Sequence, residues 1–286
     1  MNRFSAFGSL LGVLLLSTAV AAPDESKGIP KLASHEFGWQ HNVEDWEDPP
    51  EGSGHGPIKN DPAYPYRSNA QGNASGEGAT VRIVDTKDPI LKPWAAAQMQ
   101  KTNEEVFKAH ETFVTFTAQS RCFPGGVPGQ LLWPFEPFYV VQTPKIVYML
   151  WQRDHWVRRI HMTDKHSEHV KPSWFGESIG RYENSDTLVV DTIGLQTNMS
   201  FIDNFRTPHS EQLHVVERWR TIDDGKRLEV EVTVEDPKAF TTPWKGTRIW
   251  QKVDRGPMLE SVCAENNINP FNLDEYPMPE AKTPDF

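Results

Sequence analysis

The sequence is poor in the features that mark several large classes of protein. Its 29 Lys and Arg residues are outnumbered by 39 Asp and Glu, which gives a formal net charge of −10. This balance argues against nucleic-acid binding, which needs a basic surface. Beyond the N-terminus, no apolar run approaches the roughly 18 residues of a membrane-spanning helix. The sequence also has no Gly-x-Ser-x-Gly motif, no phosphate-binding loop and no Cys-x-x-Cys pair.

Aromatic residues, in contrast, are plentiful. The 286 residues include 10 Trp and 15 Phe, and hydrophobic residues make up 37% of the chain. This content is too high for a disordered chain, and the length is sufficient for one sizeable core. We therefore expect a globular protein whose aromatic side chains are buried or contact a ligand.

The first 21 residues resemble a secretory signal peptide. Arg3 is followed by an apolar run over residues 7–16 and by the small residues Ala19-Val-Ala21. We expect cleavage after Ala21, because a cut one residue later would leave Pro23 at the mature N-terminus. The apolar run is about half as long as a membrane anchor requires. No cysteine follows the cleavage site, so no lipid anchor is expected. The sequence predicts a periplasmic or secreted protein.

Export bears on the two cysteines, Cys122 and Cys263, because an oxidising compartment permits a disulfide between them. Such a bridge would close a loop of about 140 residues and stabilise the fold by roughly 4–5 kcal/mol in the chain-entropy model. The alternative is two separate buried thiols, which pack like small hydrophobic residues. The sequence leaves both possibilities open.

Residues 22–90 are rich in Pro, Gly, Asn and Asp and sustain no periodic pattern. We expect an extended arm that is held against the body by a few aromatic anchors. These anchors are Phe37, Trp39, Trp46, Tyr64 and Tyr66. From Pro93 to about His110 the residues are good helix formers, and Pro93 suits a first helical turn. One long helix is expected there.

The rest of residues 91–286 has the alternating pattern of an antiparallel sheet. Leu228, Val230, Val232 and Val234 alternate with polar residues, and the turn at residues 223–226 predicts a hairpin. About nine strands after one helix favour a mainly β fold, namely a single antiparallel barrel or strongly curled sheet. No βαβ alternation is present. The expected strands are Phe138–Gln142, Lys145–Gln152, Trp156–Met162, Ser178–Glu183, Thr187–Thr192, Leu213–Ile222, Arg227–Glu235, Lys245–Val253 and Leu259–Cys263.

One carboxylate interrupts the apolar face of a predicted strand. Glu217 follows Leu213 and Val215 in register and precedes Trp219, whereas His214, Arg218 and Arg220 point to the opposite face. A carboxylate among apolar side chains must find a partner or take up a proton. Glu217 is therefore either a general acid or base inside the barrel, or an ion-pair partner of an inward arginine such as Arg158 or Arg181.

Two further polar residues are candidates for catalysis. Asp191 lies on a strand with two half-apolar faces, so it is either a second catalytic carboxylate or a cap of the turn at residues 192–194. His209 lies in a loop that would sit at a barrel mouth, where an imidazole can move protons near neutral pH. The alternative for His209 is a loop histidine bonded to the backbone.

A histidine-rich segment offers a weaker possibility. His161, Asp164, His166 and His169 fall within nine residues, and imidazole with carboxylate suits zinc or iron. Their spacing matches no strong metal signature. The alternative is a solvated loop, and we predict no cofactor.

Several strings of this sequence resemble those of a large family of uncharacterised exported bacterial proteins. That family commonly reads G-R-W-E-G-D-T-L-V-V-D-T, H-S-E-x-L-H-V-V-E-R and D-P-x-x-F/Y-T-x-P-W, and the matching residues here are 180–192, 208–218 and 235–244. Shorter matches lie at residues 91–94, 121–128, 141–144 and 262–266. The sequence departs from the family at Tyr182 and Asn184, and its histidine-rich loop is short. The resemblance implies a lipocalin-like antiparallel barrel with recurrent polar positions at Asp191, His209, Glu211, His214, Glu217 and Arg218.

These observations support three hypotheses. In the first, a cofactor-free lyase, isomerase or hydratase holds a small apolar or aromatic molecule in the barrel, and Glu217 and Asp191 exchange protons with it, assisted by His209. If either turned inward, His214 or Arg218 would stabilise developing negative charge. The second is a non-catalytic carrier whose ligand is gripped by Trp151, Trp156, Trp219 and Arg158. The third is a metal-dependent hydrolase or oxygenase that uses the segment from His161 to His169.

Overall fold

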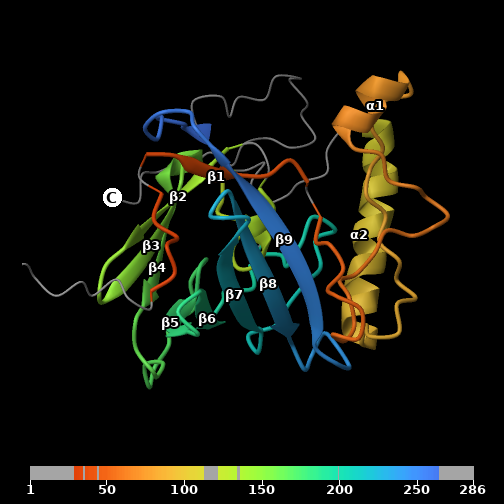
Figure 1. Cartoon of the computed structure of the whole chain (residues 1–286). Helices are drawn as coiled ribbons and strands as arrows, with labels where there is room; N and C mark the ends of the chain where they lie inside the picture. Colours follow the sequence, from red (N-terminus) through yellow and green to blue (C-terminus); the bar gives the residue numbers. More distant parts are fainter. Residues whose placement is uncertain are drawn as a thin grey trace, which may run out of the picture.

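A computed structural model describes residues 29–34, 36–43, 45–112, 122–133, 136–198 and 200–263; the expected signal peptide lies outside them. Nine strands form a closed barrel in which each strand neighbours the next in sequence (Figure 1). The strands are β1 (Gly38–Gln40), β2 (Phe138–Gln142), β3 (Ile146–Trp151), β4 (Val157–His161), β5 (Glu177–Glu183), β6 (Thr187–Ile193), β7 (His214–Ile222), β8 (Arg227–Glu235) and β9 (Trp244–Val253). The expectation of a mainly β barrel is confirmed.

Two α-helices, α1 (Asn69–Ser75) and α2 (Pro93–Thr112), stand on one side of the barrel next to β9. Helix α2 begins at Pro93, as the sequence predicted. It buries Ala95, Met99, Asn103 and Val106, whose spacing places them on one face. In the described part of the chain, neither helix is both long and apolar enough to span a bilayer.

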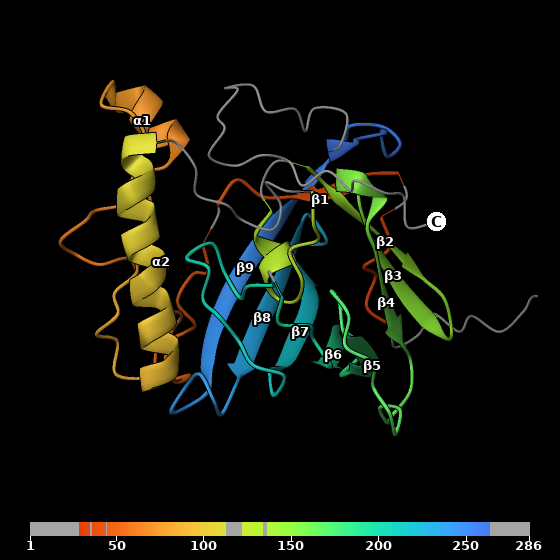
Figure 2. The same cartoon turned by 180° about the vertical axis from the view of Figure 1, so that it is seen from behind.

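The expectation of a purely antiparallel sheet is wrong at one place. Strands β4 and β5 run parallel and share only two pairs of residues, Ile160 with Ser178 and His161 with Ile179. Parallel neighbours require a connection that returns along the barrel, and residues 162–176 provide it. The seam lies on the side of the barrel away from the helices (Figure 2).

The ninth strand also differs from expectation. Residues 259–263 form no strand, whereas Gly38–Gln40 of the arm pairs with β9 and, through Trp39, with Phe138 of β2. This short part of the arm therefore closes the barrel. The segment at Cys263 is held by a disulfide to Cys122, which confirms the bridge that the sequence left open.

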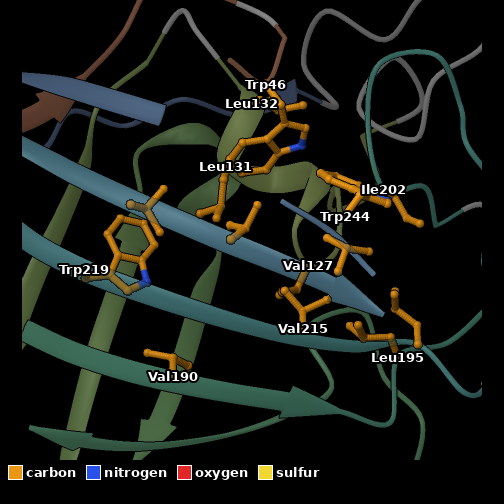
Figure 3. Packing of buried hydrophobic residues seen from close by; sticks show 14 of the residues in the cluster. Trp46, Val127, Leu131, Leu132, Val190, Leu195, Ile202, Val215, Trp219 and Trp244 are labelled. Carbon is orange, nitrogen blue, oxygen red and sulfur yellow. The ribbon is translucent and has the colours of Figure 1, made fainter. Parts of the chain in front are cut away.

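Aromatic side chains fill much of the barrel interior. Trp219 stacks on Trp250 with ring centroids 5.2 Å apart, and the ring of Phe138 contacts both of them and Trp151. Leu131 and Leu132 belong to the 3-10 helix η2 (Gly129–Leu132) and join this core from another side (Figure 3). All of these side chains are at most 3% exposed.

Candidate functional site

The polar centre of the barrel is an ion pair between Arg158 on β4 and Glu217 on β7. Nη1 of Arg158 lies 2.9 Å from Oε1 of Glu217, and Nη2 lies 2.8 Å from Oε2, so the two groups meet as a fork. The side chains are 1% and 0% exposed. Arg158 also donates to the hydroxyls of Ser178 (3.1 Å) and Thr192 (2.9 Å). The inward orientation of Glu217 is confirmed, and its partner is one of the two arginines that the sequence suggested.

Asp191 points away from this pair. Val190 is the register partner of Glu217, and Asp191 is the partner of Val216, so Asp191 and Glu217 lie on opposite faces of the barrel wall. The hypothesis that the two carboxylates act on one molecule in the lumen is therefore wrong in its geometry. Successive residues of a strand alternate between the two faces of the sheet. Asp191 would share a face with Glu217 only if its register partner were an even number of residues from Glu217 along β7.

On the outer wall, Asp191 joins two histidines. Its Oδ1 lies 2.9 Å from Nε2 of His166, and its Oδ2 lies 3.0 Å from Nε2 of His214. The hydrogen bond from His214, together with that from His166, lowers the pKa of Asp191, although partial burial opposes the shift. The same bond with Asp191 raises the pKa of His214.

The chain of polar groups continues past both histidines. Nδ1 of His166 lies 3.0 Å from Oε1 of Glu177, and Nδ1 of His214 lies 3.7 Å from Oε2 of Glu235. Glu177 also accepts bonds from the amide (2.7 Å) and hydroxyl (2.6 Å) of Ser167. The hydroxyl bond is the main cause of the lowered pKa of Glu177. We call Glu177, His166, Asp191, His214 and Glu235 the carboxylate–imidazole chain.

One end of the carboxylate–imidazole chain lies in a groove. This outer groove, of about 530 Å³, is formed where the 162–176 connection folds back on the outer face of β4. Glu177 lines it, together with two histidines of the predicted cluster, His161 and His169. Its other lining residues include Arg159, Ser167, Lys171, Trp174 and Phe175. Its volume is within the usual range for small-molecule sites.

The remaining predicted catalytic residues lie elsewhere. His209 is 3% exposed, and its Nδ1–H donates to the carbonyl of Ser210 (3.0 Å), in agreement with the backbone-bonded alternative. Burial lowers the pKa of His209. Arg218 lies on the outer face and donates to Glu183 (2.7 Å). Neither side chain reaches Glu217, so the predicted cluster is not assembled as a unit.

The predicted ligand-gripping residues belong to the core. Trp151 stacks on Phe138 and on Phe175, whereas Trp219 contacts Trp250, and both tryptophans are at most 3% exposed. Trp156 is half-buried against the same core. Arg158 is committed to Glu217. The three tryptophans thus pack against the barrel core, and Arg158 is used by its ion pair.

The predicted metal cluster is dispersed. His166 is bonded to two carboxylates, His161 and His169 line the outer groove, and Asp164 is exposed in the loop. Within the described residues, no three His, Cys, Asp or Glu side chains are arranged to hold a metal ion.

Sequence reasoning missed Glu177, Ser167 and the groove residues Arg159, Lys171 and Trp174. Glu177 opens a strand and looks like a solvated end residue, and the connection that carries Ser167 and Lys171 has no periodic pattern. Its density of histidines was the one signal that pointed to this region. No family model and no curated protein sequence matches the chain.

Proposed function

We propose that this protein is an exported enzyme that transfers protons to and from a small apolar or aromatic molecule in the outer groove. The reaction would be of the lyase, isomerase or hydratase type. The proposal keeps the reaction class, the signal peptide and the periplasmic or secreted location that the sequence predicted. It differs in placing the reaction on the outer wall instead of in the lumen. The disulfide between Cys122 and Cys263 fits an oxidising compartment.

The carboxylate–imidazole chain is the observation that carries this proposal. It links a groove-lining carboxylate, Glu177, through His166 and Asp191 to His214, whose side chain is 35% exposed. Alternating carboxylates and imidazoles at hydrogen-bond distance can pass protons, and the imidazole is the side chain best suited to this near neutral pH. The arrangement provides a route between a bound molecule and solvent.

Glu177 is the group placed to accept the proton. A carboxylate offers about four acceptor positions. Ser167 occupies two of those of Glu177 through its amide and hydroxyl, and Nδ1 of His166 lies 3.0 Å away. Its lowered pKa keeps it ionised at neutral pH. A weak base needs a way to pass the proton on. His166 offers one in the tautomer with Nε2 protonated and Nδ1 free, because Nδ1 then receives the proton from Glu177 while Nε2 gives its own to Asp191.

The proton balance then defines the reaction class. In an isomerisation, the proton removed from one carbon returns to another carbon of the same molecule. In an elimination, the electron pair of the broken C–H bond expels a leaving group, and the proton leaves through His214. Addition of water is the reverse of the second case. None of these reactions requires an electron acceptor.

The test is conversion of a compound from a complex mixture. Wild-type protein, Glu177→Gln and the control Glu229→Gln would each be incubated with a small-molecule extract of bacterial culture, followed by mass spectrometry. Glu229 is an outward carboxylate that pairs with Arg220 away from the groove. We expect wild type and the control to convert at least one compound and Glu177→Gln to convert it at least 100-fold more slowly. Equal conversion by all three proteins, or by none, would refute the proposal.

A second candidate is a non-catalytic binding protein with the same groove. It is favoured by the fact that His166 and Ser167 also fasten the 162–176 connection to β5, which is a purely structural use of the same bonds. In that case, the same incubation would return a compound that is retained by the protein but chemically unchanged.

A further inference from the structure

We infer that the outer groove binds an aromatic carboxylate, that is, a small molecule with a ring and an anionic group. This inference adds a ligand class to the site proposed above. It rests on the proposed function only in taking the groove as the place where the ligand reacts. Binding itself is argued from the lining of the groove.

The polar lining is predominantly basic. Arg159 and His161 contribute from β4, and His169 and Lys171 from the connection. None of these four side chains has a hydrogen-bond or ion-pair partner among the residues that the structure describes. Elsewhere on the outer wall, Arg181, Arg218 and Arg220 are each paired with a glutamate. The groove therefore carries two permanent cations, Arg159 and Lys171, whose charge no described carboxylate neutralises.

The basic lining also contrasts with the charge of the whole chain, which is −10. Of the side chains that line the groove, the one carboxylate is Glu177, and its charge is held by Ser167 and His166. A charged cleft with apolar walls focuses its field and attracts ligands of opposite sign, and salt screens this attraction. The groove is therefore expected to prefer anions over neutral molecules of the same shape.

Aromatic side chains supply the other half of the specificity. Trp174 stacks on Phe123 with ring centroids 5.3 Å apart, and Phe175 stacks on Trp151 at 5.7 Å. Each of these two rings is thus held by a second ring, so little side-chain freedom is lost when a ligand ring packs on them. Guanidinium and ammonium groups beside such rings suit a ligand that is flat at one end and anionic at the other.

The experiment compares 1-naphthoate with its neutral analogue 1-naphthalenemethanol, by calorimetry and by quenching of tryptophan fluorescence. We expect naphthoate to bind wild type at least tenfold more tightly than the alcohol at low salt, and the difference to shrink as salt rises. Arg159→Gln/Lys171→Gln should abolish the preference. Arg181→Gln/Lys226→Gln removes the same charge from exposed positions outside the groove and should keep it. Equal binding of both probes to wild type, or a preference that survives the groove variant, would overturn the inference.

His214→Gln separates this inference from the proposed enzyme function. His214 does not line the groove but belongs to the carboxylate–imidazole chain. Charge-selective binding that persists in this variant while no protein converts any compound supports the ligand class and refutes the enzyme. Conversion of a compound without charge-selective binding supports the enzyme and refutes the ligand class. Trp174→Leu should weaken both probes, because it removes the ring on which each would pack.

Discussion

At the scale of single residues, the most informative side chain is Glu217. Alternation along residues 213–219 placed it in the barrel from sequence alone, and its complete burial agrees with that. Its role differs from the general acid or base of the first hypothesis, because Arg158 forms two hydrogen bonds with the carboxylate and neutralises its charge. Such a pair costs much to break and contributes little compared with apolar residues of the same volume.

The first prediction concerns this pair. Glu217→Leu leaves Arg158 buried without its counter-charge and should lower the free energy of unfolding by about 3–5 kcal/mol. Arg158→Met/Glu217→Leu should recover most of that loss, since Ser178 and Thr192 also bond each other (3.0 Å) and keep a partner. Urea denaturation measures both variants. A double variant as unstable as the single one would show that the pair is more than a neutralised charge.

Asp191 could not be placed from its sequence, and the reason is physical. Val189, two residues earlier on the same outer face, is 1% exposed. Its cross-strand partners are Arg181 and Arg218, whose aliphatic stems cover apolar surface while their charged ends reach Glu183. An outer face that buries a valine under arginine stems looks half-apolar in sequence, so alternation cannot assign the side of Asp191.

The second prediction is a pH dependence of stability from His214 and Asp191. The raised pKa of His214 stabilises the fold fully below its ordinary value of 6.5, and this is lost as pH rises through the folded pKa. The lowered pKa of Asp191 stabilises above its ordinary value of 3.8, and this is lost as pH falls through the folded pKa. Both contributions are therefore present between these two values.

The measurement is the urea midpoint of wild type and His214→Gln across pH. We expect a deficit in the variant of less than about 1 kcal/mol, since the pair is partly exposed, and it should be largest between pH 4 and 6.5 and vanish at alkaline pH. His169→Gln, an exposed groove histidine, is the control. A deficit of the same size at pH 5 and pH 9 would contradict this account.

At the scale of elements, alternation located eight of the nine barrel strands, with boundary shifts of at most one residue. It could not give the direction of β5, because side-chain periodicity is identical in parallel and antiparallel strands. The 162–176 connection, which carries the chain back so that β5 runs parallel to β4, is polar and aperiodic. The outer groove depends on this returning connection, which is why the groove was not foreseen although its histidines were noticed.

The third prediction concerns the glycine that ends this connection. Gly176 has φ +61°, and a Cβ there would lie 2.3 Å from the backbone carbonyl oxygen of Ile193. Gly225, in the β7–β8 turn, has φ +79° but open space around it. Gly225→Ala should therefore cost about 1 kcal/mol for conformation alone, and Gly176→Ala about 2–3 kcal/mol, because a clash adds to the same conformational cost.

The same pair of variants reports on the site. Gly176→Ala should also weaken binding of 1-naphthoate, since the connection must shift where it lines the groove, whereas Gly225→Ala should bind as wild type does. Calorimetry at a temperature where both variants are folded makes the comparison. Equal losses of stability and equal binding in the two variants would contradict the prediction. They would mean that the connection can move away from β6 to make room for the added Cβ.

At the scale of the whole molecule, the fold is closed by segments far apart in sequence. A disulfide joins Cys122 to Cys263, 141 positions apart, and the arm supplies β1 between β2 and β9. Composition predicted an extended arm, but three residues of strand are too few to show a period. The role of the arm in closing the barrel is therefore visible only in the tertiary pairing.

The last prediction distinguishes an integral arm from a loosely attached one. Trp39 is 0% exposed, its indole N–H donates to the carbonyl of Leu32 (3.2 Å), and its backbone pairs with Phe138 and Lys252. Trp39→Ala should cost about 3–5 kcal/mol, as for a large core residue. Tyr64, another predicted anchor, is 48% exposed, so Tyr64→Ala should cost about 0.5 kcal/mol. Urea denaturation followed by tryptophan fluorescence tests both. Similar small losses of stability in both variants would mean that the barrel is stable without β1. The expected difference would make residues 38–40 part of the folding unit that maintains the outer wall and its groove.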